Sequence, residues 1–118
     1  MSYALSPNLP AKLLNDDVAT TASGILVLRG QCARVTVVLQ STGTTSGGTV
    51  AIEEAYYDEG GLIYPGTWSN LATVNASAFS GGAQTVYHII NYSVWALRVR
   101  VATTITGTGT VSAWAWGN

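Results

Sequence analysis

Apolar and polar residues alternate along most of the chain after residue 23, in short runs separated by turn residues. The run from 32 to 40, CARVTVVLQ, shows this pattern most clearly. Because successive side chains of an extended strand point to opposite faces, alternation predicts a strand with one face on a core. The odd-numbered residues are predicted to face inward and the even-numbered residues outward: Ala33, Val35, Val37 and Leu39 against Arg34, Thr36, Val38 and Gln40.

Six further runs predict the other strands. STGTTSGG, SGGAQ and TITGTGT supply turns between them, and Asn91 lies in a break between two runs. Seven or so strands at short intervals, with no convincing helix after residue 22, predict an all-β fold, an antiparallel β-sandwich of the jelly-roll or immunoglobulin-like kind. The pattern leaves the strand order and the choice of topology open. The six runs are GILVLRG, TVAIEEAYY, TWSNLATV, TVYHII, SVWALRVRVAT and TVSAWAW.

Two of these runs place charges in a strand. In TVAIEEAYY, Ile52 faces the core and Glu53 the outside, but strict alternation points Glu54 inward, so we predict a bulge or the end of the strand there. In SVWALRVRVAT, Arg98 and Arg100 share one face, which is predicted to be the wet one. The opposite, inward face is predicted to comprise Trp95, Leu97, Val99 and Val101.

Two segments depart from the β pattern. Residues 1–22 contain Pro7 and Pro10 and hold no period of two; AKLLNDD has the length of one helical turn, but Pro favours extended backbone before it. We therefore predict an extended N-terminal arm at 1–22, with a frayed terminus as the alternative, followed by the sandwich domain at 23–118. The apolar residues predicted to dock the arm on a partner are Tyr3, Leu5, Leu9, Leu13 and Leu14. The second segment is the Gly- and Pro-rich connection YDEGGLIYPGTW. Its apolar residues are predicted to close over a sandwich edge or to contact a neighbour: Leu62, Ile63 and Tyr64.

The composition narrows the range of partners. At 118 residues the chain is one domain, long enough to bury about two thirds of its unfolded surface without metal or disulfide. Charged residues make up only 9% of it, against about a quarter in an ordinary soluble domain, which indicates a hydroxyl-rich surface or one buried by partners. A net charge of −1 with five scattered Lys and Arg gives no field for a phosphate backbone, so nucleic acid is not expected as a partner.

Cysteine usage and the N-terminal sequence indicate the compartment. Cys32 has no second cysteine to pair with and lies among apolar residues, as a buried thiol does in a reducing compartment. MSYALSPNLP lacks the basic start and apolar stretch of a secretion signal, and no run approaches a membrane span. We expect the protein to be made in a cytoplasm, to stay soluble and to have no membrane partner.

No arrangement typical of catalysis or metal binding emerges from the sequence. His88, the only histidine, lies mid-strand in TVYHIINY with no acid nearby, so we interpret it as a satisfied structural histidine. Glu53 and Glu54 are neighbours in a strand and point to opposite faces, unlike the paired carboxylates of a glycosidase. Asp16, Asp17, Asp58 and Glu59 are interpreted as solvated turn residues rather than a calcium site. We therefore expect no enzyme, no catalytic residue, no metal and no cofactor.

The last predicted strand, TVSAWAW, raises the question of function. If Val111, Ala113 and Ala115 face the core, alternation sends Trp114 and Trp116 outward, and the polar Thr110 and Ser112 favour this register. Two exposed indoles would present about 300 Å² of surface and forgo about 8 kcal/mol of burial, a value comparable to the net stability of a domain. We expect a partner to cover this face. The other tryptophans, Trp68 and Trp95, are expected to be buried in the sandwich.

The order of motifs from about Ala33 to Trp116 resembles a group of small β-sandwich domains in the virion proteins of tailed phages. The pieces are RVTVVLQ, SGGTVAIEEA, the Gly-rich turn YDEGG, TWSNL, the Arg-x-Arg strand VWALRVRV and the final GTGTVSAW. The LIYP insertion before Trp68 departs from the pattern.

The resemblance implies a structural role in a virion, as a cement or decoration protein of the capsid or as a module of a tail or fibre. A single-domain chain with its own start Met and an apolar arm is most similar to a capsid cement protein. That similarity implies the major capsid protein as partner, a location on the capsid surface and a homo-oligomer, with a trimer favoured. A carbohydrate-binding module, with Trp and Tyr as stacking platforms, is the alternative.

Overall fold

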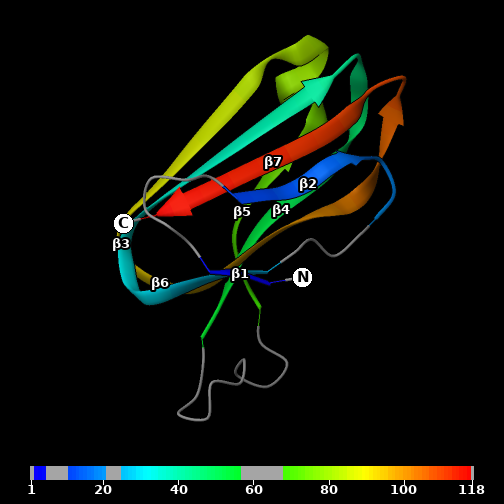
Figure 1. Ribbon diagram of the computed structural model, residues 1–118. Coiled ribbons are helices and arrows are strands. Elements are labelled where there is room, and N and C mark those ends of the chain that lie inside the picture. The colour runs from blue at the N-terminus through cyan, green and yellow to red at the C-terminus, as the bar shows by residue number, and fades with distance from the viewer. Residues whose placement is uncertain (1, 5–10, 21–24, 57–67, 118) are drawn as a thin grey trace.

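β-Strands form almost all of the described chain. The computed structural model describes residues 2–4, 11–20, 25–56 and 68–117 (Figure 1). The all-β sandwich predicted from alternation is confirmed, and its only described helix is a short 3-10 segment, η1 (Ala76–Gly82). The strands are β1 (Ser2–Ala4), β2 (Ala11–Asp17), β3 (Ile25–Thr42), β4 (Thr45–Ala55), β5 (Ser69–Asn75), β6 (Gln84–Gly107) and β7 (Thr110–Gly117).

The strands form two layers that share two long members. The hydrogen-bonded order is β2-β7-β3-β6-β4-β5, with antiparallel neighbours throughout, and β1 pairs with β3 in parallel. The first half of β6, from Gln84 to Ile90, pairs with the later part of β3. Its second half pairs with β4 from Ala96 to Gly107, and residues 96–98 also pair with residues 25–27 of β3. The first sheet is therefore β2-β7-β3-β6, with the later part of β3 and the first half of β6. The second sheet contains β1, the early part of β3, the later half of β6, β4 and β5, and β4 and β5 lie behind the first sheet in Figure 1.

β3 and β6 each join two runs that the sequence predicted as separate strands. GILVLRG and CARVTVVLQ together form β3, and the predicted break at Asn91 lies inside β6. The β3–β6 ladder shifts register between Val27 and Cys32 and again between Cys32 and Arg34. Such irregularities bend a strand, so the paired strands pass from one sheet to the other without ending.

The core lies between the two sheets and follows the predicted alternation. From the first sheet it receives the odd-numbered residues among 35–39 of β3 and 111–115 of β7, and from the second the inward faces of β4 and of the later half of β6. All the side chains named below are at most 1% exposed. They are Val35, Val37, Leu39, Val111, Ala113 and Ala115 from the first sheet, and Val50, Ile52, Leu97, Val99 and Val101 from the second.

The second part of the predicted arm is a strand of the sandwich. β2 pairs with β7, and Leu13 and Leu14 are buried in the chain's own core. The prediction that these two leucines dock on a partner is therefore wrong. The physical reason is a register shift between Lys12 and Leu14, which lets two consecutive residues be buried and hides the period of two.

We expect Leu14→Ala to lower the free energy of unfolding by about 3 kcal/mol, because it leaves a cavity among buried side chains. Lys12→Ala, two residues earlier on the exposed face of the same strand, should cost less than about 1 kcal/mol. Urea denaturation of both variants measures the difference. Equal stability of the two would contradict the placement of β2 in the core.

The η1 segment closes one end of the sandwich. Phe79 is fully buried there, and the Ser41 hydroxyl donates a hydrogen bond to its carbonyl oxygen. The Thr45 hydroxyl donates to the Ala76 carbonyl at 2.8 Å, and the Thr45 amide donates to the Ser80 hydroxyl at 2.9 Å. These bonds attach the connection between β5 and β6 to the β3–β4 turn. No helix among the described residues is long and apolar enough to cross a membrane.

Candidate functional site: the outer face of the first sheet

The final strand has the predicted orientation. Val111, Ala113 and Ala115 are fully buried, whereas Trp114 and Trp116 are half-buried and lie on the other face of β7. The outward register of both indoles is thereby confirmed. Both residues are less exposed than freely solvated indoles would be.

Cross-strand register places both indoles in an apolar surface that crosses four strands. Trp114 is paired with Lys12 on β2 and with Val38 on β3, and Val38 in turn is paired with Val86 on β6. In the next row, Trp116 is paired with Thr36, and Thr36 with His88. We call this surface the tryptophan face: Lys12, Thr36, Val38, Val86, His88, Trp114 and Trp116.

Lys12 partly covers one end of the tryptophan face. Its Nζ lies 5.1 Å from the centre of the Trp114 ring, within the range of a cation–π interaction. At the opposite end, Val86 is 46% exposed and is one of the few exposed large apolar side chains in the described chain. The face thus runs from a charged border on β2 to an uncovered apolar border on β6.

His88 belongs to the surface rather than to the interior. Its ring is exposed, and its Nδ1 lies 3.2 Å from the Thr36 hydroxyl on the neighbouring strand. The histidine therefore has the hydrogen-bond partner expected of a structural residue, but on the tryptophan face. Beyond the tryptophans, one residue of the sequence indicates this face: Val38 is apolar at a position where alternation calls for a polar residue.

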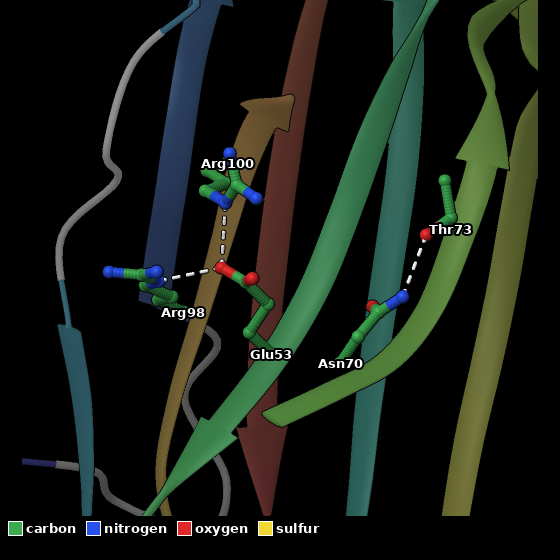
Figure 2. Close-up of polar contacts among 5 residues, drawn as sticks. All are labelled: Glu53, Asn70, Thr73, Arg98 and Arg100. Atoms are coloured by element: carbon green, nitrogen blue, oxygen red, sulfur yellow. Dashed lines mark hydrogen bonds and ion pairs between the residues drawn. The ribbon is translucent and has the colours of Figure 1, made fainter. Parts of the chain in front are cut away.

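The outer face of the second sheet carries an ion cluster (Figure 2). Glu53 on β4 is buried, and its Oε1 accepts hydrogen bonds from Nε of Arg98 at 2.7 Å and Nε of Arg100 at 2.8 Å. The face that was predicted to be wet, with Arg98 and Arg100, is therefore only partly exposed, because its charged side chains pair with one another. The Arg98 guanidinium also lies 4.3 Å from the centre of the Trp68 ring. Trp68 is half-buried over this cluster, and the prediction that it is buried in the sandwich is wrong.

Glu53 and Glu54 serve different surroundings. Glu53 is paired with Arg98 across the sheet, whereas Glu54 is paired with the buried Leu97 and is itself buried. Alternation therefore holds through Glu54, whose Oε1 accepts a hydrogen bond from the Tyr56 hydroxyl at 3.3 Å. The strand continues to Ala55, and the expected irregularity lies one step earlier, where the β4–β5 register shifts between Ile52 and Glu53.

Burial of the Glu53 carboxyl opposes its ionisation, but hydrogen bonds and charges of Arg100 and Arg98 outweigh this effect and hold its pKa below the ordinary 4.5. A lowered pKa stabilises the fold fully above pH 4.5, and this stabilisation is lost as pH falls through the lower folded value. We expect Glu53→Gln to reduce the free energy of unfolding at neutral pH by about 1–2 kcal/mol and to remove part of the acid dependence. Denaturant titrations from neutral to acid pH measure both. A variant with the wild-type acid profile would contradict this role.

Several predicted contact residues lie outside the described part of the chain. Only the backbone of Tyr3 is described, in β1 opposite Leu26, and the side chain of Trp95 is likewise not described. Of the residues predicted to contact partners, the structure places Trp114 and Trp116 together on one face and Leu13 and Leu14 in the core. The predicted contact residues outside the described ranges are Leu5, Leu9, Leu62, Ile63 and Tyr64.

Comparison with known proteins adds no relative to this picture: no protein-family model matches the chain, and neither does any curated protein. The geometry of the surfaces is therefore the basis for inferring function. Among the described surfaces, the tryptophan face exposes large apolar side chains most clearly: two indoles and two valines lie side by side on a sheet. A flat apolar surface of this kind fits another flat surface or the rings of a sugar chain.

Proposed function

We propose that the protein is a structural component of a tailed-phage virion, a cement or decoration protein that binds the major capsid protein through its tryptophan face. The observation that carries this proposal is the outward register of Trp114 and Trp116 beside Val38 and Val86. Fixed aromatic side chains at the centre of an apolar patch are the usual sources of binding energy in protein interfaces. The resemblance of the motif order to phage virion domains supports the choice of partner.

In this role the protein acts by binding and needs no catalytic residue. Contacts that exist only on the assembled shell stabilise the shell by mass action, by an amount that grows with the logarithm of protein concentration over the dissociation constant. Copies bound at many equivalent positions add their contributions. The low content of charged residues, 9%, suits a protein whose surfaces are covered by other proteins. We propose that it acts as a homo-oligomer.

Cryo-electron microscopy of particles with and without the protein tests this proposal. We expect additional density on the outer surface of the head, at symmetry-related positions, with the β2-β7-β3-β6 sheet facing the capsid. Heads that lack the protein should lose their DNA or break at lower temperature. Density confined to the tail would support the tail or fibre alternative, and particles without any such density would overturn a virion role.

A carbohydrate-binding module is the second candidate. The observation that favours it is the partial exposure of both indoles on one face, because sugar rings stack on exposed aromatic rings. Titration with polysaccharides, followed by tryptophan fluorescence, separates the candidates. A saturable change that disappears in Trp114→Ala would support carbohydrate binding, whereas unchanged emission would favour assembly.

A further inference from the structure

The two long sides of the sandwich are closed to different degrees. On one side, the Val18 carbonyl accepts a hydrogen bond from the Ile105 amide at 2.8 Å, so the segment after β2 is tied to β6 in the opposite sheet. On the other side, the first half of β6 forms the edge of the first sheet and β5 the edge of the second (Figure 1). Among the described strands, none pairs with the outer edge of β6 along 84–90.

Apolar side chains along the open side are incompletely covered. Tyr87 and Ile89 of β6 pack against the core but remain half-buried, as do Leu71 and Ala72 of β5. Corresponding core positions on the central strands are fully buried. The core therefore reaches solvent along this side, where a further strand would cover it.

The edges also differ in protection against pairing. The β2 edge carries Lys12, Asp16 and Asp17, has two register shifts and includes Asp16 at a φ of 52°, all of which hinder the addition of a strand. The stretch 84–90, QTVYHII, has no Lys, Arg, Asp, Glu, Pro or Gly, and residues 84–89 alternate regularly between exposed and half-buried. Long, regular and uncharged edges of this kind readily pair with other strands.

We propose that two copies of the chain join through these edges, residues 84–90 of one pairing antiparallel with residues 84–90 of the other about a twofold axis. The occupant is a strand because the edge offers backbone donors and acceptors at the spacing of a β-ladder. It is a second copy because an antiparallel pair about a twofold axis matches the same strand to itself, and this strand carries no Lys, Arg, Asp or Glu that would repel its copy. The first sheets of the two copies would become one continuous sheet.

This pairing has a defined geometry at its centre. If the whole stretch 84–90 is paired, Tyr87 lies on the twofold axis and Val86 lies opposite His88 of the partner subunit. The two tryptophan faces then extend into a single surface across the axis. The pairing does not depend on the capsid role, but it requires an even number of copies, in contrast to the trimer that the resemblance favours.

Sedimentation equilibrium of the full chain tests the pairing. The wild type should be a dimer or an even multiple of it, and Val86→Lys and Val86→Glu should each raise the dissociation constant about tenfold or more, because like charges then approach across the axis. An equimolar mixture of the two variants should regain the wild-type affinity. The control variant Thr104→Lys adds the same charge as Val86→Lys at an exposed position in the other half of β6, and it should leave the dissociation constant of the dimer unchanged.

Circular dichroism first establishes that each variant is folded, and only then is its association state compared with that of the wild type. Amide hydrogen exchange gives a second measurement, since protection of residues 84–90 should fall on dilution in the wild type and be low at all concentrations in Val86→Lys. A monomeric wild type, an odd number of copies, or Val86 variants with unchanged affinity would overturn the proposal. None of these outcomes bears on whether the tryptophan face binds a capsid.

Discussion

Gly109→Ala should lower the free energy of unfolding by about 4 kcal/mol, among the largest effects of any single methyl group in this chain. A Cβ at Gly109 would lie 2.4 Å from the Thr42 carbonyl oxygen, 2.8 Å from the Gly43 carbonyl carbon and 2.9 Å from the Thr44 amide nitrogen. All three are backbone atoms of the β3–β4 turn, so no side-chain rotation relieves the overlap. The two turns must separate, which also breaks the hydrogen bond from the Gly109 amide to the Thr44 carbonyl at 2.7 Å.

Gly81→Ala is the matched control for this prediction. Its Cβ would meet no atom within 4 Å, so the only cost is the left-handed backbone at a φ of +75°, about 1 kcal/mol. Thermal and urea denaturation of both variants should therefore differ by about 3 kcal/mol. If the two alanines cost the same, the contact between the β3–β4 and β6–β7 turns is looser than the structure shows.

The layers of the fold follow from the sequence wherever a strand is regular. In residues 35–39 of β3 and 111–115 of β7, the residues that alternate onto one face are all apolar, and a slip by one residue would exchange core and surface. The pattern therefore predicts the core face of both segments correctly. The outward direction of Trp114 and Trp116 follows from alternation together with the polar Thr110 and Ser112, which share their face. The order of the strands cannot be predicted from this pattern, because it depends on pairings between residues far apart in the sequence. β7, for example, lies between β2 and β3.

Irregular segments account for the wrong predictions. In β2, a register shift buries Leu13 and Leu14 together, and an apolar pair without alternation has the appearance of a docking segment. Phe79 is fully buried in η1, in a stretch of small residues that shows no periodic pattern. The ion cluster of Glu53 and Arg98 joins two strands 45 residues apart, and only the register brings them together.

The two proposed surfaces meet at Val86, which explains how assembly and binding are related. Val86 forms the uncovered border of the tryptophan face and also lies on the edge proposed to pair with a second copy. Pairing would bury that border and enlarge the apolar surface offered to a flat partner. Substitutions at the centre of the tryptophan face, away from the β6 edge, therefore separate partner binding from self-association.

The double variant Trp114→Ala/Trp116→Ala should bind capsid shells at least about a hundredfold more weakly, a loss of about 2.8 kcal/mol. Both indoles lie on the outer face of β7, and their removal takes away the largest apolar groups that this sheet presents to a partner. The fold should persist, because Val111, Ala113 and Ala115 hold the same strand in the core. Co-sedimentation with shells that lack the protein measures the affinity.

Trp68→Ala provides the control for the loss of an aromatic ring. Trp68 is half-buried like the other two tryptophans, but it lies over Arg98 on the outer face of the second sheet. Its removal should change capsid affinity by less than about threefold, within the range of surface substitutions distant from an interface. A double variant that binds as tightly as the wild type would move the binding site away from the tryptophan face, and a large loss in Trp68→Ala would move it to the opposite side of the sandwich.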